Sequence, residues 1–174
     1  KTKVPEAVLN LKVAYELKSC FEASGMKVIM TRKDEKGLYD EGYKGNRKKQ
    51  DMFRRGEIIK NSGADLMISI HMNAYADGVS RGAQVFYRPG CEASQQLAAM
   101  IQESLRTIDP NNRRKHKPED FFILKQGDMP SVIVECGFLS QPDEEKLLLD
   151  DKYQKKIAWC IYVAASEYLI KKAG

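Results

Sequence analysis

Two short apolar runs that each end in a reactive side chain constrain the fold of this sequence most. Residues 64–74 alternate apolar and other side chains with period two, which predicts a strand that carries His71 at its carboxyl end. Residues 132–135 read Val-Ile-Val-Glu and predict a second strand, which ends on Glu135. A helical pattern over residues 92–108 lies between them, and a helical crossover is typical of parallel strands. We therefore expect the histidine and the glutamate at the same edge of one sheet.

The rest of the chain alternates between helical and extended patterns. Helices are expected from Pro5 and Glu6 to Gly25, and over 51–60, 92–108, 143–149 and 152–171; further strands are expected over 26–31, 83–87, 121–125 and 131–136. Charged, glycine-containing loops are expected over 33–49 and 109–119. This alternation predicts a single α/β domain over residues 1–174, with a largely parallel twisted sheet flanked by helices. The first strand of that sheet is expected upstream of Lys1.

Composition excludes several classes of protein. With 174 residues and 43% hydrophobic content, the chain can bury one full core. It contains no apolar run of 18 residues, so we expect membrane attachment only through a segment upstream of Lys1. The net charge is +5, and no nucleic-acid-binding motif accompanies it, so nucleic acid is not an expected partner. The four cysteines form no C-x-x-C pair, and we expect no disulfide framework.

Three side chains are candidates for chemistry at the carboxyl edge of the sheet. His71 suits a metal ligand or a general base, and a hydrogen-bonded structural histidine is the alternative. Glu135 ends an apolar strand, where a carboxylate is costly unless it is paired or used. Glu6 begins the first helix and should face the same edge, although an acid there also complements the helix dipole. The other histidine, His116, lies between two lysines and is expected to be solvated.

One histidine and two glutamates at this edge indicate a hydrolytic zinc site. Catalytic zinc takes three protein ligands and keeps one position for water, while an unligated carboxylate moves protons. Glu6 and His71 would be ligands and Glu135 the proton shuttle, so these residues leave one ligand unaccounted for.

The sequence resembles the zinc-dependent N-acetylmuramoyl-L-alanine amidases of the AmiC/CwlD type over essentially its whole length. The resemblance lies in Pro5-Glu6 before Asn10-Leu11, Val-Ile-Met-Thr-Arg at 28–32, Ser-Ile-His-Met-Asn-Ala at 69–74 and Val-Glu-Cys-Gly-Phe-Leu-Ser at 134–140. The charged loop of residues 38–55 is similar to the subgroup that spore-forming bacteria use on cortex peptidoglycan.

The resemblance implies roles for individual residues. Glu6 and His71 match two zinc ligands of the family, and Glu135 matches its catalytic glutamate. The family's first ligand is a histidine in an Asp-Pro-Gly-His-Gly-Gly motif, which these 174 residues do not contain. We expect that ligand shortly before Lys1.

The implied reaction is hydrolysis of the amide between N-acetylmuramic acid and L-alanine in peptidoglycan. In the spore-cortex subgroup this cut prepares muramic acid for conversion to the lactam that germination needs. The resemblance implies one zinc ion and an exported protein, in the cell wall or the forespore intermembrane space. Asn73, Arg113 and Arg114 lie in loops near the edge and are expected to contact the substrate, with plain surface residues as the alternative.

Two other functions remain open. The first is a non-catalytic module of the same fold that binds peptidoglycan or docks a partner, and the missing first ligand favours it. The second is a zinc peptidase or carboxypeptidase acting on cell-wall peptides. A partner protein covering the metal edge is compatible with the catalytic and the non-catalytic reading.

Overall fold

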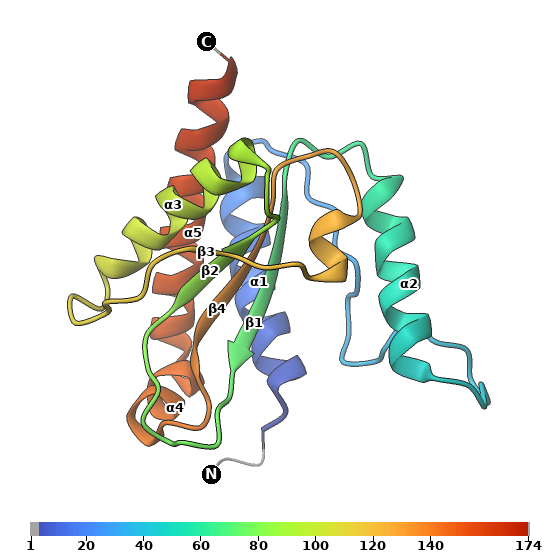
Figure 1. Cartoon of the computed structure of the whole chain (residues 1–174), viewed down its shortest axis with the longest axis horizontal. Helices are drawn as coiled ribbons and strands as arrows, with labels where there is room; N and C mark the ends of the chain where they lie inside the picture. The colour runs from blue at the N-terminus through green and yellow to red at the C-terminus, as the bar shows by residue number, and fades with distance from the viewer. Residues whose placement is uncertain (1–3, 174) are drawn as a thin grey trace.

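The computed structural model describes residues 4–173 and places a four-stranded sheet between helices (Figure 1). The helices are α1 (Glu6–Ala23), α2 (Arg47–Lys60), α3 (Glu92–Arg106), the 3-10 helix η1 (Phe122–Lys125), α4 (Pro142–Leu149) and α5 (Asp151–Ala173). The strands are β1 (Met67–Asn73), β2 (Gln84–Tyr87), β3 (Lys117–Pro118) and β4 (Ser131–Phe138). Among the described helices, none has the length and apolarity needed to cross a bilayer.

Strand β4 lies inside the sheet, whose order is β1-β4-β2-β3. It pairs with β1 in parallel and with β2 antiparallel, and β2 pairs with β3 in parallel. Seven of the eight residues of β4 are buried, as expected for a strand covered on both faces. The parallel β1–β4 pair confirms the arrangement predicted from the two apolar runs, and the single-domain α/β class is confirmed with it.

The two faces of the sheet bury cores of different size. Val132 and Val134 of β4 point into the larger core, which α1, α3 and α5 cover. Ile133 points the other way, into a smaller cluster with Ile123 and Leu124 of η1 and Ile59 of α2. Figure 1 shows α1, α3 and α5 gathered on one side of the sheet and α2 standing apart on the other. The face that carries Glu135 is therefore the more open one.

Helix α1 forms where the apolar pattern predicted it, and its ends have local causes. Leu9, Val13 and Leu17 recur at helical spacing and are buried against the sheet and α5. Proline precedes the first helical residue, Glu6, and Gly25 follows the helix with a φ of 82°, a backbone conformation that favours glycine. The helix thus brings Glu6 to the carboxyl end of β1.

Two predicted strands are wrong. Residues 26–31 form no strand, because no strand of the described chain lies beside them; Met26 and Val28 nevertheless pack against the larger core. Residues 121–125 form the turn of η1 instead of a strand. The neighbouring residues Ile123 and Leu124 are both buried in the smaller cluster, which successive residues of a strand could not achieve on one face.

Helix α2 begins four residues before the predicted start. The side chain of Asn46 accepts a hydrogen bond from the backbone N–H of Lys49 at 2.9 Å, which caps the helix inside the expected loop. The second predicted loop, 109–119, contains the two-residue strand β3. The first difference concerns a helix boundary, which depends on a single cap, and the second concerns a short strand, which exists only through its pairing with β2.

A buried carboxylate, Glu144 of α4, ties together the two segments that bound the carboxyl edge of the sheet. Glu144 is 6% exposed. Its Oε1 accepts a hydrogen bond from the backbone N–H of Gly82 at 2.7 Å, and its Oε2 accepts one from Phe138 at 2.9 Å. Desolvation raises the pKa of Glu144, while these two bonds act in the opposite direction. The start of β2 and the end of β4 are therefore fixed to one side chain.

We predict that Glu144→Gln lowers the free energy of unfolding by about 1–3 kcal/mol, because an amide can accept only one of these two buried N–H bonds. Asp143→Asn removes the same charge from the exposed first turn of α4 and should cost less than about 1 kcal/mol. Urea unfolding measures both changes. Equal effects of the two substitutions would contradict the bracing role of Glu144.

Candidate active site

The three candidate residues predicted from the sequence lie together at the carboxyl edge of the sheet. His71 of β1 and Glu135 of β4 are direct partners in the parallel register. Glu6, the first residue of α1, contacts His71 across 65 positions of sequence. Figure 1 shows the start of α1 and the arrowhead of β1 at the same end of the molecule. In α/β sheets, ligand sites gather at this edge because the loops that follow parallel strands meet there.

The imidazole of His71 is held from both of its nitrogens. Nδ1 lies 3.1 Å from Oε1 of Glu6, and Nε2 lies 3.1 Å from the hydroxyl of Ser69, two residues back on the same face of β1. The side chains of His71 and Glu6 are 42% and 43% exposed, so a ligand can reach the pair from solvent.

Oε1 of Glu6 collects three contacts. Besides His71, the side-chain amide of Asn10 donates to it at 2.9 Å, and the backbone N–H of Met72 donates at 3.3 Å. Partial burial alone would raise the pKa of Glu6, but the hydrogen bonds from His71, Asn10 and the backbone of Met72, together with the charge of His71, outweigh it and hold the pKa at about 2. Glu6 is therefore a carboxylate at any physiological pH, as a cation ligand must be.

Glu135 has the opposite environment. Burial raises its pKa to about 7; the charge of His71 lowers the pKa and that of Glu6 raises it further, both by less. Its Oε2 is buried and has no hydrogen-bond partner among the described residues. An acid that lines a cavity and titrates near neutral pH is suited to accept a proton and release it again.

A cavity of about 420 Å³ opens beside Glu135 on the same face of the sheet. Asn73, at the end of β1, and Arg114, in the loop before β3, both line it. Gln84 of β2 also lines it, opposite Glu135 in the antiparallel register.

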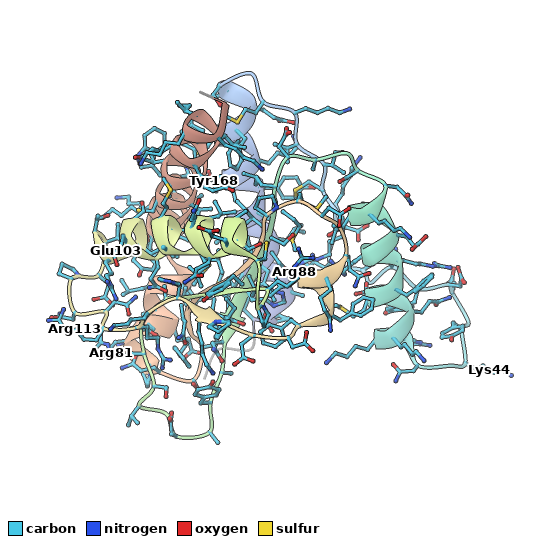
Figure 2. All side chains as sticks on the ribbon, turned by 45° about the horizontal axis from the view of Figure 1, so that its top comes forward. Lys44, Arg81, Arg88, Glu103, Arg113 and Tyr168 are labelled. Carbon is cyan, nitrogen blue, oxygen red and sulfur yellow. The ribbon has the colours of Figure 1, made fainter. Side chains whose placement is uncertain are left out.

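Two other polar residues lie elsewhere. Arg113 does not line this cavity; its guanidinium donates to the backbone carbonyl of Pro110 at 2.8 Å, and Figure 2 shows it at the outer edge of the molecule. His116 packs its ring against Tyr87, with 5.8 Å between ring centroids, and takes no part in the His71 cluster. The adjacent arginines, which the sequence could not separate, thus occupy different surroundings.

His71 and Glu6 supply two donor atoms of the kind that bind metal ions. An imidazole nitrogen and an ionised carboxylate oxygen 3.1 Å apart are two donors of the type that zinc prefers. Within residues 4–173, no group of three or more His, Cys, Asp or Glu side chains could hold a metal ion. The described residues thus fit part of a zinc site and do not complete one.

Several residues that shape this site were not singled out from the sequence. Asn10 lies four positions after Glu6 on α1, and this i, i+4 spacing could have indicated the contact. Ser69 shares the face of His71 on β1 and could have been found in the same way. Gln84 could not, because its place opposite Glu135 depends on the antiparallel pairing of β2.

Comparisons with known proteins give consistent matches. The family model described as N-acetylmuramoyl-L-alanine amidase matches residues 1–167. The germination-specific N-acetylmuramoyl-L-alanine amidase of Bacillus subtilis (strain 168) is 36% identical over 173 residues, which cover 98% of this chain and 73% of the relative.

Solved structures of amidases are also similar to this chain. The CwlD amidase from Clostridioides difficile, in complex with the GerS lipoprotein, superimposes with a TM-score of 0.93 at 41% identity, covering 96% of this chain and 87% of that one. The N-acetylmuramoyl-L-alanine amidase from Clostridium difficile 630 has a TM-score of 0.87 at 28% identity, covering 98% and 87%.

The buried position of Glu135 predicts a pH-dependent cost to stability in the metal-free protein. The folded-state pKa of about 7 lies above the ordinary value of 4.5. Between these values the unfolded state releases its proton first, so the free energy of unfolding falls as pH rises, and the full cost is present above pH 7.

We therefore expect Glu135→Gln to stabilise the chelator-treated protein at about pH 8 and to leave its stability nearly unchanged at about pH 4. Glu103→Gln makes the same substitution on the exposed surface of α3 and serves as the control, with little change at either pH. Urea unfolding at the two pH values measures this. Destabilisation of Glu135→Gln at pH 8 would show that its charge is not costly there.

Proposed function

The chain belongs to the N-acetylmuramoyl-L-alanine amidase family, and we propose that it hydrolyses the amide between the lactyl group of N-acetylmuramic acid and L-alanine in peptidoglycan. The observation that carries this proposal is the cluster at the sheet edge. A histidine and an ionised glutamate in contact, next to a buried acid with a pKa near neutrality, match the needs of metal-assisted amide hydrolysis.

We propose that Glu6 and His71 hold a zinc ion, with one further ligand from outside the described residues. Nδ1 of His71 and the carboxylate of Glu6 are the donors, and Asn10 and Ser69 would orient them as outer-shell partners. When bound there, zinc would polarise the scissile carbonyl and make an attacking water more acidic.

The chain's own residues would then manage protons and position. Glu135 would accept the proton of the attacking water on its carboxylate and pass it to the nitrogen of the leaving L-alanine. Its pKa of about 7 supports both transfers at neutral pH. Asn73 and Arg114 line the adjacent cavity and would orient the substrate. Arg113 is no longer favoured for this role, because it lies away from the cavity.

We also propose a biological setting. The similarity to a germination-specific relative supports a role in spore-cortex maturation, in which the cut muramic acid is converted to its lactam. Peptidoglycan lies outside the cytoplasm, so we propose that the protein acts in the cell wall or the forespore intermembrane space.

A protein partner is a further part of the proposal. The CwlD amidase was solved with the GerS lipoprotein bound, and it is 41% identical to this chain. We propose that this chain also binds a partner protein, at the edge that carries Glu6 and His71, where both side chains are accessible.

A non-catalytic function is the alternative to the amidase, and the partial metal site favours it. Because the described residues contain only part of a metal site, the fold could serve as a non-catalytic peptidoglycan-binding or partner-docking module. Digestion of purified peptidoglycan by the zinc-supplemented full-length protein separates the two functions. The amidase releases stem peptides with a free L-alanine amino terminus and leaves the glycan strands intact. A folded protein that binds peptidoglycan without releasing peptides would support the module.

We predict that Glu135→Gln lowers kcat by about two to four orders of magnitude, because the amide cannot accept the proton of the water. Zinc content, measured by atomic emission, and the circular dichroism spectrum should match those of the parent protein. Turnover at the parental rate would remove Glu135 from the role of proton shuttle.

We predict that His71→Ala weakens zinc binding by at least about tenfold, because a direct ligand is lost. His116→Ala removes the other histidine, which packs on Tyr87 and makes no contact with Glu6 or His71 that the described residues show, and should leave zinc affinity unchanged. Competition with a chromophoric chelator measures both affinities. Unchanged zinc affinity in His71→Ala would exclude this residue from the ligand set.

A further inference from the structure

The cavity beside Glu135 carries a cation that its own surroundings leave unpaired. Two basic side chains line the cavity, Arg114 and Lys117. Lys117 forms an ion pair with Glu119 at 2.7 Å. Among the described residues, no carboxylate lies within ion-pair distance of Arg114. A cation without a counter-charge in a substrate cavity is a natural site for an anionic group of the ligand.

The carboxylate of Asp77 interacts electrostatically with Arg114, but its hydrogen bonds are made with other residues. Asp77 accepts a hydrogen bond from the hydroxyl of Ser80 at 2.6 Å, and its other oxygen accepts from the backbone N–H groups of Val79 and Ser80 at 3.1 Å. These bonds, followed by the charge of Arg114, lower the pKa of Asp77. Asp77 therefore closes its own turn and does not pair with the guanidinium.

The guanidinium of Arg114 is fixed in place before any substrate binds. Its Nε donates to the backbone carbonyl of Arg81 at 2.7 Å, and Nη1 donates to the side-chain oxygen of Gln84 at 3.0 Å. The group also lies over the ring of Phe138, 4.5 Å from its centroid. A planar guanidinium held at three points loses little conformational entropy when it binds a carboxylate.

The backbone beneath Arg114 is anchored as firmly. Asn112 is 3% exposed; its amide donates to the carbonyl of Ala83 at 2.8 Å, and its Oδ1 accepts from the N–H of Arg114 at 2.9 Å. Gly82 makes room for this contact, because a Cβ there would lie 2.6 Å from Oδ1 of Asn112, and its φ of 91° also favours glycine. The loop that presents Arg114 is thus attached directly to the start of β2.

The position of Arg114 relative to Glu135 selects one substrate group. Gln84, which holds the guanidinium, lies opposite Glu135 in the β2–β4 register, so the cation is close to the bond that would be cut. In stem peptides, the residue after L-alanine is D-glutamate, whose γ-carboxyl group is joined to the third residue. Its α-carboxyl group is free and negatively charged in some peptidoglycans and is a neutral carboxamide in others. This is the carboxyl group of the stem nearest to the scissile amide.

We propose that Arg114 binds the α-carboxylate of the second stem residue, and that the enzyme therefore prefers stems that carry this carboxylate over amidated stems. The proposal rests on the proposed amidase function. It makes Arg114 a specificity-determining residue, whereas its neighbour Arg113 has no such role.

The test compares two small substrates, N-acetylmuramoyl-L-alanyl-D-glutamate and its D-isoglutamine analogue, with the zinc-supplemented full-length enzyme. We expect the parent enzyme to show a kcat/KM about tenfold or more higher for the acid, mainly through KM, because a charge-assisted hydrogen bond is lost in the amide. Arg114→Gln should lower kcat/KM for the acid by a similar factor and remove the preference. Arg113→Gln, with the same loss of charge one residue away, should keep both values.

The outcomes separate this proposal from the amidase function. Hydrolysis of both substrates with equal kcat/KM by the parent enzyme, or a preference that survives Arg114→Gln, would overturn the specificity role and leave the amidase standing. Hydrolysis of neither substrate, nor of peptidoglycan, would overturn the amidase function and the specificity role together. The preference of the parent enzyme needs no substitution, so the test holds even where Arg114→Gln fails to fold.

Discussion

The parallel, in-register pairing of β1 with β4 is the interaction on which the rest of the structure depends. It sets His71 opposite Glu135 and points both side chains to the less covered face of the sheet. Glu135 is only partly buried, but the desolvation that this causes is enough to raise its pKa to about 7. A shift of register by one residue would move these side chains to opposite faces and destroy the cluster.

The surrounding elements hold the residues of this edge in place, and the charge of Glu135 there lowers the stability of the fold. Helix α1 delivers Glu6 to His71, and Glu144 holds the end of β4 against the start of β2. The partly buried charge of Glu135 opposes folding at neutral pH, a cost that the proposed role in proton transfer would explain. The apolar layers of α1, α3 and α5 on the opposite face supply the core that compensates for it. Chemistry and stability are thus divided between the two faces of one sheet.

The sequence contains enough information for the parts of the fold that follow from local patterns. The helices, β1, β4 and their parallel relation could be predicted because their apolar periods are clear. The strand expected over 26–31 could not be verified from its pattern, since a strand exists only with a partner beside it. The turn at η1 was missed because a short apolar run fits several conformations, and tertiary packing decides between them. The sequence predicted that Glu6, His71 and Glu135 lie together, whereas the separation of Arg113 from Arg114 depends on the anchoring contact of Asn112.

We propose that Glu6 and His71 bind zinc while Glu135 stays unligated as the proton shuttle. Anomalous X-ray diffraction at the zinc edge, from crystals of the zinc-loaded full-length protein, tests it most directly. We expect one anomalous peak in contact with the Glu6 carboxylate and Nδ1 of His71, with Glu135 beyond direct coordination distance. A peak away from this pair, or one that Glu135 coordinates, would contradict it.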